Sequence, residues 1–282
     1  DKPIRIGDLI GNKFRITIRN FTKGDFTELE EKIKQIQQSG FPNYFDSQRF
    51  RSVAGKKFIA KEVIKKEYEQ AVKIFITSYT RHDKSMIKQE KRDLFQNWGK
   101  FKNMKLTNKT SAKIVQVYQQ TKSWLETYKS VPRDMRELFS ASYQSYLWNE
   151  CVKQMLKQQI PKQLFPVSYA LGELYFYKKR DQEIPLIFQT IGAKLKPHPH
   201  EEKIITTLLQ KEGITLAEFD TKKITGNDFG VRERKIIVIP KEIEIVSKES
   251  DELNKNRLKL TLQFSLPRGS YATVLLKALF RK

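Results

Sequence analysis

Hydrophobic and polar residues alternate in several short segments near the two ends of the chain, as they do in half-buried β-strands. Four segments have this strand pattern: residues 13–20, 234–239, 242–246 and 257–264. In the first, three apolar side chains fall on one face and mostly basic side chains fall on the other. We expect an antiparallel sheet with one buried face. RNA can lie on a basic opposite face, and an ordinary solvated strand explains the pattern equally well.

The spacing of apolar residues predicts helices over much of the remaining chain. After Asp25, which we expect to be an N-cap, apolar side chains recur at helical spacing until Gly40 ends the helix. Residues from about 61 to 160 are predicted to be mostly helical, and a last helix follows over 271–280. The stretch 161–230 contains five prolines, so we expect short helices and loops there.

Composition adds a strong charge. The 282 residues include 54 lysines and arginines against 32 aspartates and glutamates, which gives a net charge of +22 at pH 7. Because basic surfaces release counterions from phosphates, this charge favours a nucleic-acid partner. A lysine-rich surface without such a partner is the alternative that charge alone leaves open. No run of about 18 apolar residues exists that would predict a membrane span.

The sequence offers few groups for metal or nucleophilic chemistry. Its single cysteine, Cys151, cannot form an internal disulfide, fits a reducing cytoplasm and excludes a cysteine-based zinc site. His198 and His200 flank a proline, so we expect their imidazoles to diverge, and His82 stands apart in the sequence. We therefore expect no metal site, no hydrolase triad around Cys151 and no glycine-rich phosphate loop.

Three segments carry distinctive motifs. They are Asn-Tyr-Phe-Asp-Ser-Gln-Arg-Phe at 43–50, Tyr-Gln-Ser-Tyr-Leu-Trp-Asn at 143–149 and Phe-Ser-Leu-Pro-Arg-Gly-Ser-Tyr-Ala-Thr at 264–273. The sequence Gly-Asn-Lys-Phe-Arg-Ile at 11–16 precedes them. In this order, and over nearly the whole chain, these segments resemble the motifs of the TruD family of tRNA pseudouridine synthases.

The resemblance implies an α+β fold. A mixed, antiparallel pseudouridine-synthase sheet domain would be interrupted by a mostly helical TruD-type insertion domain. We expect the catalytic domain over residues 1–69 and 231–282, and the insertion domain over 70–230. The resemblance also implies isomerisation of a uridine, uridine 13, to pseudouridine in folded tRNA, with an aspartate nucleophile and without a cofactor or metal. The expected protein is a cytoplasmic monomer that binds tRNA and no membrane.

The residues that match the motifs receive roles from the resemblance and from physical reasoning. A uridine inside folded RNA must leave its stack, and Phe45 is the candidate aromatic face that receives it, a contact worth about 1–3 kcal/mol. The amide of Asn43 would hold the loop or read the uracil edge. Gln48 and Arg49 would position the loop, or Arg49 would contact phosphate. Ser270 lies at a predicted helix N-terminus, where it binds an anion or serves only as the N-cap. Basic residues expected to contact RNA are Lys13, Arg15, Arg19 and Arg268.

Some positions depart from the family pattern. Asp46 and Arg51 stand where glycine is usual, and Trp148 stands where phenylalanine is usual. No segment of residues 1–282 matches the family's Gly-x-Lys-Asp-type nucleophile motif, since Asp83 lies in the wrong part of the chain. We expect the nucleophile on sequence upstream of this chain. The alternative is a catalytically inactive RNA-binding paralogue, and a third interpretation is a structural protein with incidental lysine richness.

Overall fold

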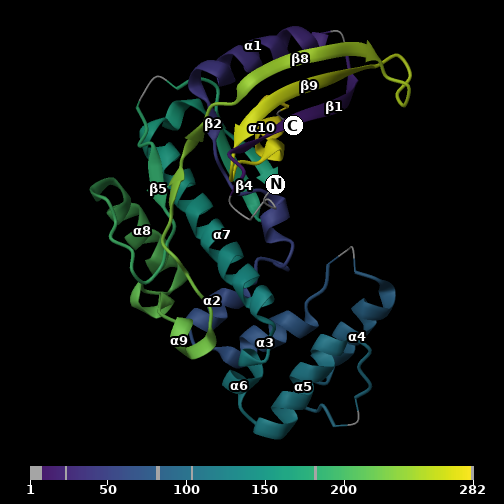
Figure 1. The fold of residues 1–282 in the computed structure, drawn as a ribbon, viewed down its shortest axis with the longest axis vertical. Coiled ribbons are helices and arrows are strands. Elements are labelled where there is room, and N and C mark those ends of the chain that lie inside the picture. Colours follow the sequence, from purple (N-terminus) through teal and green to yellow (C-terminus); the bar gives the residue numbers. More distant parts are fainter. Residues whose placement is uncertain (1–7, 23, 81–82, 103, 181–182, 281–282) are drawn as a thin grey trace. The chain divides into compact units, whose positions relative to one another are not determined.

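A computed structural model describes residues 8–22, 24–80, 83–102, 104–180 and 183–280 (Figure 1). Its strands are β1 (Gly11–Phe21), β2 (Phe41–Pro42), β3 (Leu164–Tyr169), β4 (Gly172–Tyr177), β5 (Ile187–Gln189), β6 (Glu233–Lys235), β7 (Ile237–Val238), β8 (Lys241–Ser250) and β9 (Leu258–Pro267). Its α-helices are α1 (Gly24–Ser39), α2 (Ile59–Ile64), α3 (Tyr68–Thr77), α4 (Ser85–Gln96), α5 (Lys109–Thr121), α6 (Trp124–Lys129), α7 (Arg133–Gln159), α8 (Pro199–Glu212), α9 (Lys222–Thr225) and α10 (Ala272–Leu279). Single 3-10 turns are η1 (Ser47–Phe50), η2 (Pro161–Gln163) and η3 (Ala217–Phe219). The predicted α+β class is confirmed.

The three-stranded antiparallel sheet has the order β1-β9-β8, so strands from the two ends of the chain lie side by side. Phe14 is opposite Phe264, and the two rings stack with their centroids 5.5 Å apart. On β9, every second residue from Leu260 to Leu266 is buried. The predicted strands at 13–20 and 257–264 are confirmed, because a burial period of two is what a one-sided sheet requires.

Helix α1 runs along β8 (Figure 1), and its buried residues are apolar side chains at the helical spacing that predicted this helix: Phe26, Leu29, Ile33 and Ile36. Gly40 ends the helix with φ of +69°, and a Cβ there would lie 2.8 Å from the Val238 carbonyl oxygen. The prediction that Asp25 is the N-cap is wrong. Its carboxylate accepts hydrogen bonds from the Thr22 backbone N–H (2.6 Å) and hydroxyl (2.7 Å). This is the threonine–acid spacing of a capping box, in which the acid lies inside the first turn.

The helical stretch from 61 to 160 is confirmed, but the expectation of irregular structure over 161–230 is wrong in two places. Strands β3 and β4 form an antiparallel hairpin that includes Pro166. In a two-stranded ladder every strand is an edge, where proline is tolerated. Helix α8 runs for 14 residues from Pro199, a first-turn position at which proline favours a helix. Both prolines therefore belong to regular elements.

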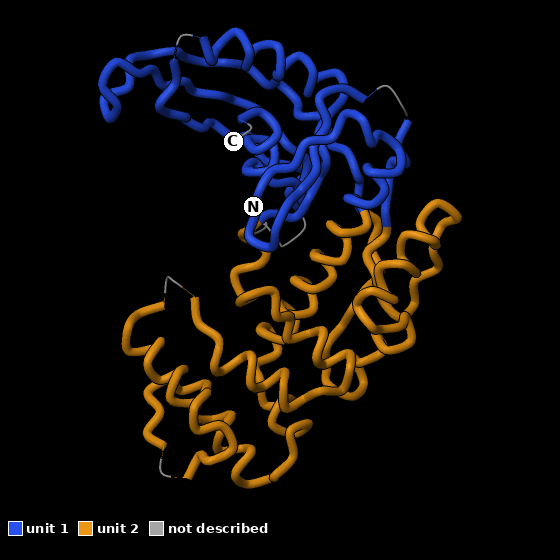
Figure 2. Tube along the Cα trace, turned by 180° about the vertical axis from the view of Figure 1, so that it is seen from behind, with its two compact units in different colours: residues 1–46, 152–188, 234–282 blue, residues 47–151, 189–233 orange. Residues whose placement is uncertain are grey.

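The chain divides into two compact units (Figure 2). Unit 1 contains residues 1–46, 152–188 and 234–282, and it includes the sheet β1-β9-β8 with α1 and α10. Unit 2 contains residues 47–151 and 189–233, and it is mainly helical. The boundaries expected for a catalytic domain and an insertion domain stay a prediction. Within the described residues, none of the helices is long and apolar enough to cross a bilayer.

Candidate functional site

Asn43 and Phe45 follow β2 on a buried loop of unit 1, and Arg234 from β6 holds this loop. The Arg234 guanidinium donates hydrogen bonds to the Asn43 carbonyl oxygen at 2.6 and 3.1 Å. Its central carbon lies 3.9 Å from the centre of the Phe45 ring, which is only 8% exposed. The Asn43 backbone N–H donates to the Ile236 carbonyl (2.7 Å), and its side-chain amide donates to the Lys235 carbonyl (3.1 Å). The loop is therefore tied to the strand that carries Arg234.

The same guanidinium reaches the C-terminal motif. Arg234 donates a further hydrogen bond to the Gly269 carbonyl oxygen at 2.8 Å. Gly269 has φ of +82°, the left-handed conformation that favours glycine, so the turn before α10 depends on this residue. The ring of Tyr271 meets Phe45 edge to face at 6.2 Å between centroids. The structure thus brings together the first and last motifs, which are more than 200 residues apart in the chain.

Some polar side-chain atoms in these motifs are buried without a hydrogen-bond partner among the described residues. They are Asn43 Oδ1, Ser270 Oγ and Thr273 Oγ1. The N-cap of α10 is Tyr271 rather than Ser270, so the interpretation of Ser270 as an N-cap is wrong. Unsatisfied buried polar atoms are uncommon and cost free energy, and they are frequent at functional sites.

Asp46, which the resemblance predicts to stand at a glycine position, is also buried, with 2% of its side chain exposed. Both of its carboxylate oxygens accept hydrogen bonds from the Lys277 ammonium of α10, at 2.7 and 2.8 Å. A carboxylate without such a partner would repel RNA phosphates. The ion pair neutralises it and joins the loop to the C-terminal helix.

Gln48 and Arg49 lie on η1, which belongs to unit 2. Gln48 is exposed and Arg49 is half-buried. The Arg49 carbonyl oxygen accepts a hydrogen bond from the Ser142 hydroxyl at 3.0 Å, which fixes the turn to helix α7. The roles expected for these two side chains stay predictions.

The motif at 143–149 lies within α7, and most of its large side chains are core residues. Tyr143 and Trp148 are completely buried. The Tyr143 hydroxyl donates a hydrogen bond to Glu212 at 3.0 Å, and burial together with this carboxylate raises the pKa of the tyrosine well above its usual value. Lys61 contacts the same Glu212 oxygen at 2.6 Å. This motif stabilises the helical unit.

The basic residues expected to contact RNA differ in their surroundings. Arg15 and Arg268 are exposed, and the backbone N–H of Arg268 donates to the Ile10 carbonyl. Lys13 lies 3.4 Å from Glu242 on β8, so the polar sheet face carries carboxylates as well as cations. Arg19 contacts Asp251 (3.0 Å) and Glu252 (2.8 Å), which links β1 to the turn between β8 and β9. That pairing gives Arg19 a structural role.

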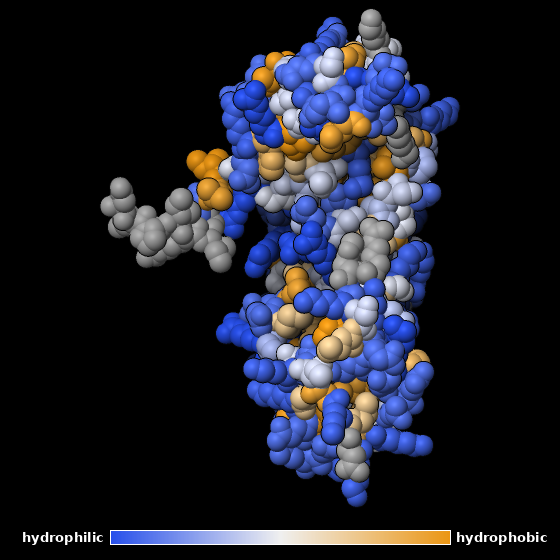
Figure 3. All heavy atoms as spheres, turned by 90° about the vertical axis from the view of Figure 1, so that its right-hand side faces the viewer, coloured by the Kyte–Doolittle hydropathy of each residue, from blue (hydrophilic) through white to orange (hydrophobic). Residues whose placement is uncertain are grey.

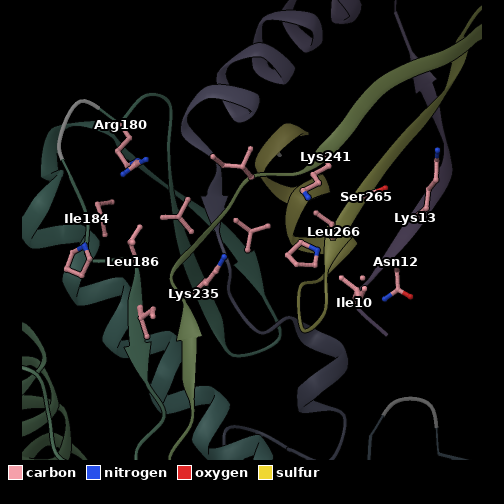
Figure 4. A pocket seen from close by; sticks show the side chains of 17 residues that line it. Ile10, Asn12, Lys13, Arg180, Ile184, Leu186, Lys235, Lys241, Ser265 and Leu266 are labelled. Carbon is pink, nitrogen blue, oxygen red and sulfur yellow. The ribbon is translucent and has the colours of Figure 1, made fainter. Parts of the chain in front are cut away.

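A groove of about 720 Å³ lies in unit 1, and one of the residues that line it is Lys235, whose carbonyl oxygen accepts the hydrogen bond from the Asn43 side chain (Figure 4). Figure 4 shows Ile184 and Leu186 on one side, and Ile10 and Leu266 on the other. The cationic residues that line it are Lys13, Arg180, Lys235 and Lys241. An apolar groove with these cations suits a group that combines an apolar surface with negative charge.

Other candidate groups of the sequence have no such setting. Cys151 is buried, and burial raises the pKa of its thiol, as expected for a structural cysteine. The rings of His198 and His200 are parallel, with centroids 5.6 Å apart, so the expectation that they diverge is wrong. His82 lies outside the described residues. Across the described ranges, no cluster of three or more His, Cys, Asp or Glu side chains could hold a metal ion.

Comparison with known proteins decides the family. A sequence model described as tRNA pseudouridine synthase D (TruD) matches residues 1–279. The chain belongs to the TruD family. The resemblance drawn from the motifs is therefore confirmed.

Relatives in this family match almost the entire chain. A probable tRNA pseudouridine synthase D 2 of Methanocaldococcus jannaschii is 40% identical over 292 residues, which cover 99% of this chain and 69% of the relative. A probable tRNA pseudouridine synthase D 1 of Methanococcus maripaludis is 38% identical, covering 99% of this chain and 75% of the relative. A crystal structure named for TruD of Methanosarcina mazei superposes with a TM-score of 0.75 at 21% identity. It covers 98% of this chain and 70% of that one, and it shows the same fold.

The sequence of this TruD chain did not mark two residues, Arg234 and Lys277, that join the loop of Asn43 and Phe45 to the C-terminal motif and α10. Each contacts the first motif only through the tertiary fold, so no local pattern marks it. The one available signal for Arg234 was a basic residue at the start of a short strand. Lys277 lies in the last turn of α10, where a lysine ordinarily needs no further explanation.

Proposed function

We propose that the gene product containing this chain isomerises a uridine, uridine 13, to pseudouridine in folded tRNA. The observation that carries the proposal is the cluster in which Arg234 joins Phe45 and Asn43 to the C-terminal turn. Family membership supports the reaction class. Because no motif in residues 1–282 matches the family's nucleophile motif, we assign to this chain the binding of the target base, and not the nucleophile.

In this proposal the target uracil leaves the RNA stack and lies on the Phe45 ring. Unstacking costs a few kcal/mol, and stacking on an aromatic ring returns about 1–3 kcal/mol. The Arg234 guanidinium covers a face of the Phe45 ring, with its central carbon 3.9 Å from the ring centre. Uracil must therefore replace the guanidinium on the ring. The displaced guanidinium can then bind a phosphate, which it recognises by two parallel hydrogen bonds. Arg234 thus holds the position of the base until RNA binds.

Asn43 has a second part in this proposal. Its Nδ2 donates to the Lys235 carbonyl and keeps the loop in place, while Oδ1 has no partner among the described residues. Uracil presents one N–H donor on its pairing edge, and a carbonyl oxygen such as Asn43 Oδ1 accepts it. Ser270 Oγ and Thr273 Oγ1 are further partners for the uracil oxygens or a phosphate. In this proposal Asn43 therefore both holds the loop and reads the uracil edge, the two roles that the sequence left as alternatives.

The test is an assay of the full-length gene product on an unmodified tRNA transcript, with pseudouridine located by mass spectrometry after chemical tagging. We expect one tagged site, at uridine 13, and no product when that uridine is replaced by cytidine. A folded protein that binds tRNA with no isomerisation would instead identify an inactive RNA-binding paralogue. Binding of tRNA no tighter than of any polyanion would support incidental lysine richness.

A further inference from the structure

Residues 94–125 of unit 2 form a basic segment with no acidic residue. Its six lysines are Lys100, Lys102, Lys105, Lys109, Lys113 and Lys122. All six are exposed, and within the described residues none of them forms an ion pair. Other surface lysines do pair with carboxylates, as Lys129 does with Glu126 (2.8 Å) and Lys222 with Asp228 (2.8 Å). The charge of this segment is therefore not neutralised locally.

Aromatic side chains of the same segment stack on one another. The rings of Trp98 and Trp124 are nearly parallel, 10° apart, with centroids 5.2 Å apart. Tyr118 stacks on Trp124 with centroids 3.8 Å apart. Phe101 meets Trp98 and Tyr118 edge to face and is buried beneath them. Trp98 is oriented further by a 2.7 Å hydrogen bond from its indole N–H to Glu69. These rings form a rigid group.

The group is not enclosed as a core would be. Trp98, Tyr118 and Trp124 are all half-buried, and Phe95 beside them is 57% exposed. The lower half of Figure 3, which faces the side of α4 and α5, shows apolar surface lying among hydrophilic side chains. Aromatic rings that lie together and stay partly exposed are typical of a binding site.

Flexible cations cover these rings. Lys73 Nζ lies 5.4 Å from the centre of the Trp98 ring and 5.1 Å from that of Phe95. Lys122 Nζ lies 5.7 Å from the centre of the Tyr118 ring. A lysine ammonium over an exposed ring contributes only about 0.5–1 kcal/mol. A nucleobase can displace it at small cost, and the released ammonium can then bind the adjacent phosphate.

We propose that an aromatic–lysine face, in which Phe95, Trp98, Tyr118 and Trp124 supply the rings and the six lysines of the same segment supply positive charge, binds an unpaired segment of RNA by base stacking. Stacked aromatic rings bordered by cations are the chemistry by which proteins hold single strands. Paired bases are buried within a duplex, so unpaired nucleotides such as those of a loop suit these rings better. The proposal rests on the proposed function for the identity of the RNA, an unpaired segment of the tRNA substrate.

Intrinsic tryptophan fluorescence tests this proposal directly. Of the three tryptophans, Trp98 and Trp124 lie in the face and Trp148 is completely buried. Titration with an oligouridylate should quench the fluorescence as bases stack on the face. Inorganic polyphosphate, which has charge without bases, should bind without that quenching. RNA binding that leaves the fluorescence unchanged would overturn the proposal.

Variants separate stacking from charge. Trp98→Phe and Trp124→Phe should each reduce the amplitude of the quenching. The double variant Lys100→Ala/Lys102→Ala should weaken oligouridylate binding several-fold. It should also reduce the slope of log binding constant against log salt concentration by about 1.4, because each phosphate contact on a single strand contributes about 0.7 to that slope. Lys222→Ala removes an exposed cation outside the face and is the matched control. Equal loss of affinity in the control would contradict a local face. If a tryptophan variant does not fold, Phe95→Ser replaces it as the test. This substitution is at an exposed position and should weaken oligouridylate binding.

Kinetics distinguish this proposal from the function itself. In the isomerisation assay, Lys100→Ala/Lys102→Ala should raise KM several-fold and leave kcat unchanged, because the face lies outside the Phe45 cluster. Quenching by RNA without any pseudouridine formation would refute the proposed enzyme and retain the RNA-binding face. Isomerisation without quenching would retain the enzyme and refute the face.

Discussion

The Lys277 ammonium lies 2.7 and 2.8 Å from the two carboxylate oxygens of Asp46, and the carboxylate is almost fully buried. A buried charge that loses its partner is strongly destabilising, whereas replacing both partners can be nearly neutral. The negative charge of Asp46 is therefore matched by a cation on α10.

Removal of Lys277 should destabilise unit 1. Lys277→Ala should lower the free energy of unfolding by about 3 kcal/mol, because it leaves Asp46 buried and unpaired. Asp46→Asn/Lys277→Met should recover more than half of this loss. Urea denaturation measures both, and Lys222→Ala, which breaks only an exposed ion pair, should change stability by less than about 0.5 kcal/mol. Unchanged stability of Lys277→Ala would contradict the assigned pairing.

Arg234 should hold two distant loops at once. Arg234→Met keeps much of the apolar contact with Phe45 but removes the hydrogen bonds to the Asn43 and Gly269 carbonyls. Amide hydrogen exchange should therefore become faster in residues 41–46 and in 267–271 together. Arg232→Met, at an exposed position two residues earlier, is the control and should change neither segment. Faster exchange in only one segment would show that Arg234 does not link them.

Acid should weaken the link between β1 and the turn at 251–252. Burial raises the pKa of Asp251, but hydrogen bonds from Asn254, Asn20, Leu253 and Arg19 outweigh it and leave a lowered pKa. Hydrogen bonds from Arg19 and Lys259 lower the pKa of Glu252 to about 2. Lowered pKa values mean that both carboxylates stabilise the fold fully above their unfolded values near 4.

This stabilisation should be lost progressively as the pH falls below about 4.5, with the contribution of Glu252 lost by about pH 2 and that of Asp251 at still lower pH. Asp251→Asn should have a lower melting temperature than the parent protein at pH 7, and the difference should shrink on acidification. Thermal unfolding at pH 7, 5, 4 and 3 measures it. A difference that stays constant across this range would rule out the carboxylate as its source.

Strands and helices with a clear period could be predicted from sequence, because burial of one face imposes that period locally. The alternating residues of β9 and the four apolar residues of α1 are examples. The hairpin β3–β4 was missed because Pro166 argued against a strand. The effect of one proline depends on whether its strand is an edge, which the local sequence does not specify.

The candidate site was predictable to the extent that motifs mark it. Asn43, Phe45 and the C-terminal turn were found because their residue types recur as motifs. Arg234 and Lys277 were not, since their partners lie 191 and 231 positions away in the chain. Such pairings arise only when β6 and α10 pack beside the loop, and an isolated arginine or lysine gives no sign of them.

The central claim is that Phe45 receives the target uracil, and Phe45→Leu tests it. Because the ring is only 8% exposed, Phe45→Ala would cost about 3–5 kcal/mol of stability, whereas leucine retains an apolar side chain at this position. The most direct measurement is single-turnover pseudouridine formation by the full-length gene product on unmodified tRNA, with folding and tRNA binding measured in parallel. The account predicts that Phe45→Leu slows the reaction by about 5- to 150-fold, the equivalent of one stacking contact, while Lys222→Ala reacts at the normal rate. A normal rate for a folded Phe45→Leu protein would contradict it.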